Sequence, residues 1–248
     1  MAITITNGVT FTNGVQIIGT ANSSIGSTAS TQTPTLNGFA VGTSFGSPFS
    51  VSVNSYQCST QPASAPYNYV SVPGSSGFAF GTGDFTIEWF QYQSSVTTFP
   101  RAFWYGTTPT YGVSEESSSL YFWVPGANGS PGLGTILNTW VHFAVVRIGT
   151  SLKYYRNGTV MSSTFTNSTN FTDTASTFFI GSKANTGLQS EQFIGSITSF
   201  RVCKGVGVYT GNFTTPTSQL GQTQSANPYG GANTSAITAG QCSLLLNP

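Results

Sequence analysis

Side chains able to do acid–base chemistry are few in this sequence. Its 248 residues include six carboxylates, seven lysines and arginines, and one histidine. The closest carboxylate pairs are Asp84 with Glu88, and Glu115 with the adjacent Glu116. We expect Asp84 in a turn and Glu88 in a strand, and neighbouring residues of an extended segment point to opposite faces. Neither spacing predicts a pair that acts together, so we expect no catalytic residues and no enzyme.

The histidine and the cysteines do not form a recognisable reactive site. His142 lies beside Trp140 in an expected strand, with no nucleophile and supporting acid nearby, so we expect a hydrogen-bonded structural histidine. Cys58, Cys203 and Cys242 lack the spacing of metal ligands. Buried free thiols are the default expectation. One bridge, such as Cys58 to Cys242, is the alternative in an oxidising medium.

Aromatic side chains offer a different chemistry, because aromatic rings stack on sugars while planar polar groups fix the sugar's orientation. The region of residues 100–130 is rich in such rings and in the Gly and Pro of surface turns. The candidate glycan-binding residues there are Trp104, Tyr105, Tyr111, Trp123 and Asn128. The alternative is that these rings fill the hydrophobic core. We place Trp89 and Trp140, which lie in clear strand patterns, in the core.

The elements that must position these residues read as β-strands. Apolar and polar residues alternate, turn residues separate the runs, and no helical period is sustained. Asn157-Gly158 between two runs predicts a hairpin with a two-residue turn. The expected strands cover residues 85–92, 140–147, 151–156, 159–161, 178–180 and 193–202. This pattern predicts an all-β fold, a two-sheet antiparallel sandwich.

Buried arginines in such strands would need a partner of opposite charge. Arg201 lies in a strand otherwise lined by apolar residues, and Glu88 is one of six available carboxylates. We expect a structural ion pair of Glu88 with Arg201 or Arg147.

The first 50 residues differ from the rest. Asn7-Gly8 and Asn13-Gly14 repeat a turn signal between short strands, and residues 20–50 are poor in core residues. We therefore divide the chain into an extended N-terminal arm, residues 1–50, and a sandwich, residues 51–248. The alternative for the arm is a disordered tail.

The sandwich region resembles the laminin-G-like domains of the concanavalin A-like lectin/glucanase superfamily. The motifs are in the order and spacing of that family, and the resemblance covers about residues 50–248. It implies a concanavalin A-like jelly roll. The segments that carry the resemblance are residues 68–89, 139–147, 152–160, 179–182, 193–202, 209–217 and 243–246.

The resemblance raises two questions about chemistry. The superfamily contains glycosidases, which need two carboxylates about 5–10 Å apart across the sugar. Glucanases of this fold place acids at alternate positions on one strand, a pattern that this sequence lacks. Laminin-G-like domains also often bind calcium through an Asp and backbone carbonyls, which makes Asp173 and Asp84 the candidate ligands. We expect that no cofactor is required and that Ca²⁺ is an optional ligand.

Charge and resemblance together predict the function. Only 5% of the residues are charged and the net charge is +1, so we expect no nucleic-acid partner. No apolar run approaches the roughly 20 residues that span a bilayer, so we expect no membrane insertion, and no signal peptide is recognisable. Domains like this one are common in bacteriophage structural proteins.

We therefore predict a non-enzymatic virion structural protein of a tailed phage: an outer capsid decoration, tail or fibre component. Made in the host cytoplasm and displayed on the virion exterior, it would contact copies of itself and other virion proteins through residues 1–50. Neutral host-surface glycans are its expected ligands. One alternative is a lectin or adhesion module outside a virion, and a glucanase-like enzyme is the less favoured one.

Overall fold

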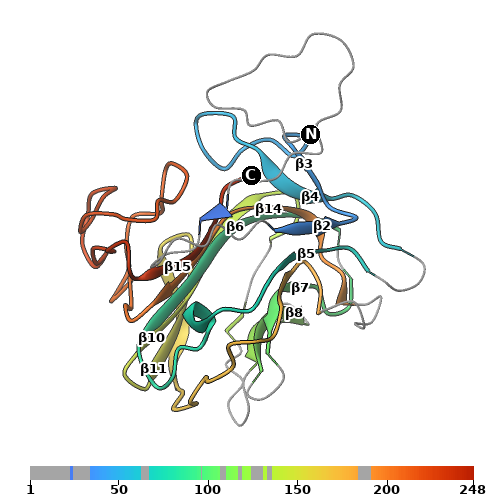
Figure 1. The fold of residues 1–248 in the computed structure, drawn as a ribbon. Helices are drawn as coiled ribbons and strands as arrows, with labels where there is room; N and C mark the ends of the chain where they lie inside the picture. Colours follow the sequence, from blue (N-terminus) through green and yellow to red (C-terminus); the bar gives the residue numbers. More distant parts are fainter. Residues whose placement is uncertain are drawn as a thin grey trace, which may run out of the picture.

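Two antiparallel β-sheets stack face to face in the computed structural model, which confirms the predicted sandwich (Figure 1). The described residues include the short 3-10 helix η1 (Ser76–Phe78), and no helix among them is long and apolar enough to cross a membrane. The structure describes residues 23–24, 34–62, 67–95, 97–106, 110–116, 119–123, 131–132, 136–183 and 191–248.

The larger sheet has nine strands in the described chain. Its main path runs β1-β15-β14-β6-β10-β11-β12, and β4 also pairs with β14 and with β3. Its strands are β1 (Ser23–Ser24), β3 (Ala40–Gly42), β4 (Ser55–Cys58), β6 (Phe85–Ser95), β10 (Trp140–Ile148), β11 (Ser151–Arg156), β12 (Thr159–Thr166), β14 (Ile194–Lys204) and β15 (Cys242–Leu246).

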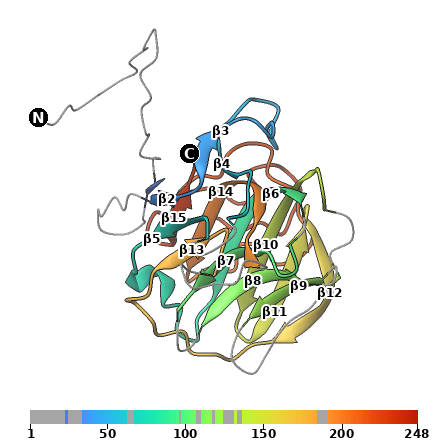
Figure 2. The same cartoon turned by 90° about the vertical axis from the view of Figure 1, so that its right-hand side faces the viewer.

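The smaller sheet has six described strands in the order β2-β5-β13-β7-β8-β9 (Figure 2). They are β2 (Thr35–Asn37), β5 (Tyr69–Val72), β7 (Arg101–Tyr105), β8 (Tyr111–Glu116), β9 (Ser119–Trp123) and β13 (Phe178–Ile180).

Alternation along the strands builds the core between the sheets. Phe85, Ile87 and Trp89 of β6 are all buried in it, and the ring of Trp89 lies 5.5 Å from Phe103 of β7 and 5.7 Å from Phe143 of β10. Fully burying one such side chain contributes about 1.5–3 kcal/mol. The six predicted strand segments are confirmed, with small shifts at their ends.

The predicted hairpin is also confirmed. Arg156 pairs with Thr159, and the two turn residues, Asn157 (φ 47°) and Gly158 (φ 75°), both have positive φ. Two positive φ angles are typical of the type I′ turn that matches the twist of paired strands. A side chain at Gly158 would also meet the carbonyl oxygen of Phe213.

The boundary predicted at residue 51 is too late. Strands β2 and β3 lie before it and belong to the two sheets, and Phe39 and Phe49 are buried. Within residues 1–33 only β1 is described, where Ser23 pairs with Leu246 and so adds two residues to the edge of β15. The turn repeat predicted over residues 1–20 lies outside the described residues.

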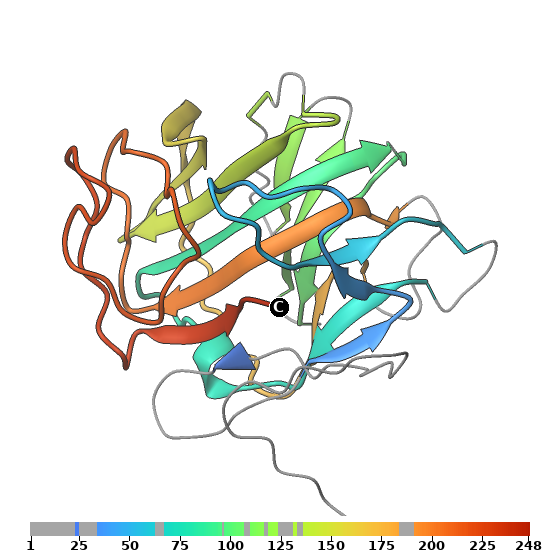
Figure 3. The same cartoon turned by 90° about the horizontal axis from the view of Figure 1, so that it is seen from above.

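The outer face of the larger sheet is covered by two segments. Residues 205–241 bring a second apolar cluster, including Val208, Tyr209 and Leu220, against it. Residues 43–54 cross β14 and β6 (Figure 3), and there the indole of Trp140 donates to the carbonyl oxygen of Phe45 at 3.0 Å. The strands of the smaller sheet instead face the viewer in Figure 2 and carry the half-buried aromatic side chains described below.

Candidate functional site

Two tryptophans share a row on the outer face of the smaller sheet. Trp104 of β7 is opposite Gly112 of β8, which is opposite Trp123 of β9. Residues directly opposite in paired strands project from the same face. Both indoles are half-buried, whereas the residues that alternate with them, Phe103 and Phe122, are in the core.

Gly112 leaves room for the Trp104 indole. A Cβ added at Gly112 would lie 2.4 Å from Cε3 of Trp104. The Trp104 indole therefore lies directly against the backbone of β8, in space that any other residue would fill. We call Trp104, Gly112 and Trp123 the tryptophan platform.

Arg101 joins the two indoles. Its guanidinium carbon lies 5.0 Å from the ring centroid of Trp104 and 5.6 Å from that of Trp123, within the range of a cation–π contact. A register shift between Arg101 and Phe103 interrupts the alternation of β7 at this point. Arg101 is only 6% exposed and donates from Nη2 to Oε1 of Glu191 at 2.8 Å.

Trp123 is held from two further sides. Its indole Nε1 donates to Oγ of Ser114 at 2.5 Å, and the ring of Tyr121 stacks beside it at 6.0 Å. These contacts fix the plane of the indole, so that its orientation is set before any ligand binds.

The aromatic face continues beyond Trp104. Phe179 of β13 pairs with Trp104, and the ring of Tyr69 of β5 packs edge-on against Phe179 at 5.2 Å. Half-buried aromatic side chains thus extend across the smaller sheet from β5 to β9.

Lys183 completes the surroundings of the tryptophan platform. Its Nζ lies 4.9 Å from the Trp104 ring centroid and 3.9 Å from Oε1 of Glu191. Its side chain is 42% exposed. The ammonium therefore lies over the Trp104 ring on a side chain that is partly exposed to solvent.

The covered outer face of the larger sheet holds a buried polar network. Arg201 donates from Nε and Nη2 to Oε1 of Glu88 at 2.9 and 2.7 Å, and Oε2 of Glu88 accepts from Tyr209 at 2.7 Å and lies 3.1 Å from Nε2 of His142. Burial would raise the pKa of Glu88, but the charge of Arg201 and the contacts with His142 and Tyr209 lower it to about 2. The predicted Glu88–Arg201 pair and structural role of His142 are confirmed.

Arg147 does not take part in that network, because it points into the other side of the sheet. Its guanidinium instead donates to four uncharged oxygens, and burial lowers its pKa to about 10. The acceptors are the carbonyl oxygens of Gly81, Gly83 and Thr169 and Oδ1 of Asn167.

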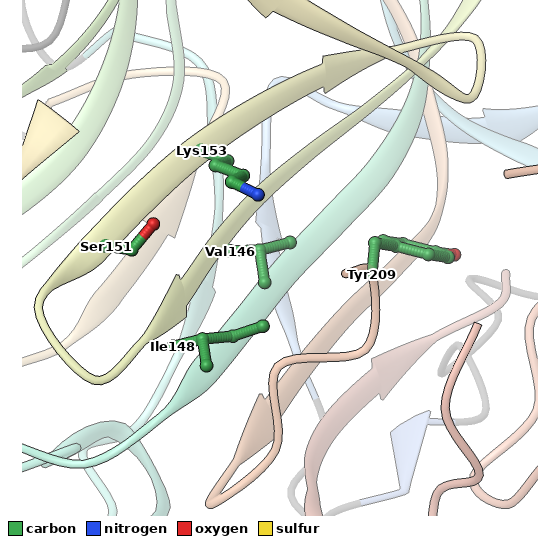
Figure 4. A pocket seen from close by; sticks show the side chains of 5 residues that line it. All are labelled: Val146, Ile148, Ser151, Lys153 and Tyr209. Atoms are coloured by element: carbon green, nitrogen blue, oxygen red, sulfur yellow. The ribbon is translucent and has the colours of Figure 1, made fainter. Parts of the chain in front are cut away.

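A small hollow lies on the side of the larger sheet (Figure 4). Val146 and Ile148 of β10, Ser151 and Lys153 of β11 and Tyr209 line its volume of about 130 Å³. Ligand sites usually enclose about 300–1,000 Å³. We therefore place the candidate site on the tryptophan platform.

Comparison with known proteins gives the family. A family model described as the concanavalin A-like lectin/glucanases superfamily, Laminin_G_3, matches residues 63–206. The chain belongs to this family. The family's description covers lectins and glucanases, so membership alone does not decide between binding and hydrolysis. A search of curated proteins found no match.

Solved structures share the fold of this Laminin_G_3 domain. Domain 4 of AbnA, an extracellular arabinanase from Geobacillus stearothermophilus solved in complex with arabinotriose, is 16% identical with a TM-score of 0.51, over 71% of this chain and 84% of that one. The binding domain of Paraclostridial Mosquitocidal Protein 1 is 12% identical with a TM-score of 0.53, over 75% of this chain and 44% of that one. At such identities the likeness supports the fold alone.

Within this Laminin_G_3 domain, the predicted glycan-binding residues separate into two groups. Trp104 and Trp123 lie together on the outer face, whereas Tyr105 and Tyr111 are at most 1% exposed. Their rings pack on each other at 5.1 Å, and Tyr111 donates to the carbonyl oxygen of Phe78. The assignment of these two tyrosines to a sugar surface is therefore wrong. Asn128 lies outside the described residues.

The expectation that Trp140 lies in the core is also wrong. Trp89 is buried in the core as predicted, but Trp140 is not. Trp140 is half-buried on the outer face of the larger sheet, where its ring contacts Tyr92 under residues 43–54.

The two candidate calcium ligands each accept hydrogen bonds from backbone N–H groups. Oδ1 of Asp84 accepts from the backbone N of Gly149 at 2.8 Å, and Oδ1 of Asp173 accepts from the backbone N of Ala175 and of Ser176. No group of three or more His, Cys, Asp or Glu able to hold a metal lies within the described residues. Calcium also binds carbonyl oxygens, so its binding here stays a prediction.

The cysteines are buried free thiols, as expected by default. Cys203 of β14 is opposite Cys242 of β15, and their side chains hydrogen-bond. Cys58 instead accepts from Nδ2 of Asn68 at 3.3 Å. A Cys58–Cys242 bridge is therefore the wrong pairing.

Sequence reasoning missed the residues around the platform. Arg101, Lys183 and Glu191 come from distant parts of the chain, and no local pattern joins them. Tyr69 and Phe179 carried a usable signal, because each alternates with buried neighbours in a short strand.

Proposed function

We propose that this chain is a non-enzymatic carbohydrate-binding module whose ligand stacks on the tryptophan platform. The observation that carries the proposal is the pair of half-buried indoles, Trp104 and Trp123, held side by side across Gly112. Rigid, partly exposed aromatic rings suit the apolar face of a sugar ring, and their cost in lost motion is low because the rings are already fixed.

The spacing of the platform favours an oligosaccharide. Trp104 and Trp123 are two strands apart in the sheet. Neighbouring strands lie about 4.8 Å apart, so the backbones of Trp104 and Trp123 are separated by about 10 Å. With Phe179 of β13 on the far side of Trp104, the aromatic row crosses four neighbouring strands and is longer than a single sugar ring.

The carboxylates support binding without hydrolysis. Glycoside hydrolysis uses two carboxyl groups that face each other across the bond to be cut. The five carboxylates with described side chains are each engaged elsewhere, by separate partners. They are Asp84 with Gly149, Glu88 with Arg201, Glu115 with Gln91, Asp173 with Ser176, and Glu191 with Arg101.

One structural neighbour also supports a carbohydrate ligand. Domain 4 of AbnA has the same fold and was solved with arabinotriose bound. Arabinan oligosaccharides are therefore the first ligands to try.

The wider role in a phage virion is part of the same proposal. Its support is the low charge of the chain, which reduces repulsion between neighbouring copies, and the pairing of β1 with the edge of β15. In this pairing a segment of residues 1–50 adds a strand to a sheet of its own chain, and contacts of the same kind with other virion proteins are part of the proposal. Electron microscopy of particles from the native source, labelled with an antibody to this chain, tests it. Many copies on the particle exterior are expected, and particles without the chain would refute this role.

Binding is tested by affinity electrophoresis against arabinan, galactan, xylan and pectin, followed by calorimetry with oligosaccharides of any polymer that retards the chain. Trp104→Ala should weaken binding at least tenfold. Trp140→Ala is the matched control, because Trp140 is also half-buried but lies on the outer face of the other sheet. Circular dichroism confirms that both variants fold. Equal binding by wild type and Trp104→Ala would refute the platform as the site.

A further inference from the structure

We infer that the ligand of the tryptophan platform is an anionic glycan, whose negative group is recognised by Lys183. This inference rests on the proposed function and names the ligand's chemical class. It departs from the neutral glycans that the overall charge predicted, because the most exposed of the charged side chains described beside the platform is a lysine.

The first observation is the position of Lys183. Its ammonium lies 4.9 Å from the centroid of the Trp104 ring, and its side chain is 42% exposed. A sugar that binds at Trp104 would meet this ammonium, which lies over the ring. A carboxylate or sulfate on that sugar could then accept charge-assisted hydrogen bonds, which are about twice as strong as neutral ones.

The second observation is that Glu191 already forms an ion pair with Arg101. Arg101 donates to Oε1 of Glu191 at 2.8 Å, and the two side chains are only 6% and 5% exposed. A buried arginine and carboxylate neutralise each other, and separating them would be costly. Lys183 lies 3.9 Å from the same oxygen, which is too far for a hydrogen bond.

Among the described side chains beside the platform, the positive charge is the more exposed one. Arg101 and Glu191 are buried against each other, whereas the side chain of Lys183 is 42% exposed. An ammonium has three hydrogen-bond donors, and at an exposed site it can bind an anionic group while keeping part of its hydration.

The arrangement also explains the buried partners. Arg101 contacts both indoles and Glu191, so it fixes the two rings of the platform relative to each other. Glu191 holds Arg101 in place, and its electrostatic attraction keeps the Lys183 ammonium, 3.9 Å from its Oε1, near Trp104. Arg101 and Glu191 are then positioning residues, and Lys183 is the residue that contacts the ligand.

The test uses ligand pairs that share a sugar ring and differ in charge: polygalacturonate with its methyl ester, and dextran sulfate with dextran. Binding of the full chain is measured by calorimetry at 50 and 300 mM NaCl. We expect the acidic member of at least one pair to bind at least tenfold more tightly at the lower salt concentration, with the difference shrinking at the higher.

Variants assign the preference to one side chain. Lys183→Gln should reduce the acidic-to-neutral ratio at least fivefold, and Lys183→Arg should keep most of it. Lys153→Gln is the matched control, because Lys153 lies beside the hollow on the other sheet and should leave the ratio unchanged. Trp104→Ala should weaken both members of the pair, since both stack on its ring.

The outcomes separate this inference from the proposed function. Equal binding of both members of each pair, a preference for neutral members, or a ratio insensitive to Lys183→Gln would overturn the anionic ligand and leave glycan binding standing. Absence of binding to these pairs and to the neutral polymers would overturn both proposals.

Discussion

The free energy of unfolding of the wild type should fall as pH rises, because the buried Glu115 loses its proton. Replacing Glu115 by glutamine should remove this dependence on pH. Glu115 is 6% exposed and lies between the sheets, where Oε1 accepts from Nε2 of Gln91 at 2.5 Å. Gln91 in turn accepts from the indole of Trp89 at 2.7 Å. Burial raises the pKa of Glu115 from 4.5 to about 7, because the charged form is poorly solvated there.

The sign and size follow from the two pKa values. The folded state holds the proton more tightly than the unfolded state, so the contribution to stability is complete below pH 4.5 and is lost as pH rises to about 7. A pKa difference of one corresponds to about 1.4 kcal/mol. The rise from 4.5 to about 7 therefore corresponds to a loss of about 3 kcal/mol.

Urea unfolding of wild type and Glu115→Gln between pH 4 and pH 8.5 measures this loss. The free energy of unfolding of the wild type should fall by about 3 kcal/mol relative to the variant across that range, with most of the change between pH 4.5 and 7. Other titrating groups are common to both proteins and cancel in the difference. A difference that does not change with pH would refute a buried, proton-binding Glu115.

Three further predictions concern the opposite sheet and the platform. Arg201→Met should destabilise the fold by about 3–5 kcal/mol in urea unfolding at pH 7, because it leaves Glu88 buried without its cation; a loss below 1 kcal/mol would contradict the network. Since the pKa of Glu88 is lowered to about 2, stability from this group is present above pH 4.5 and should fall as pH drops from 4.5 towards 2, a slope that Glu88→Gln should remove in the same titration. Gly112→Ala should displace the Trp104 indole and weaken glycan binding at least fivefold with the fold retained, and unchanged calorimetry would argue against contact between Trp104 and β8.

Much of the sandwich could be predicted from alternation, and the limits of that signal are visible in single residues. Phe85, Ile87 and Trp89 alternate and are in the core. The residues between them, Thr86 and Glu88, are equally buried, because residues 205–241 cover their face. That segment has no periodicity, so its place on the sheet follows from tertiary packing alone.

The candidate site shows the same division. Trp104 and Tyr105 are neighbours in one strand and must point to opposite faces, so a strict use of alternation would have kept only one of them on a sugar surface. Alternation alone does not predict the side to which Arg101 points, because a register shift follows it in β7. Lys183 and Glu191 reach the platform through the pairing of distant strands, which a single sequence does not encode locally.

The four tryptophans allow the most direct test of the tryptophan platform. Each indole N–H gives one signal in a nitrogen–proton NMR spectrum, and the four lie in distinct places: Trp89 in the core, Trp140 under residues 43–54, and Trp104 and Trp123 on the platform. Titration with the tightest-binding oligosaccharide should shift the signals of Trp104 and Trp123 and leave those of Trp89 and Trp140 in place. Shifts confined to Trp140, or no shift at either platform tryptophan on saturation, would contradict binding at this face.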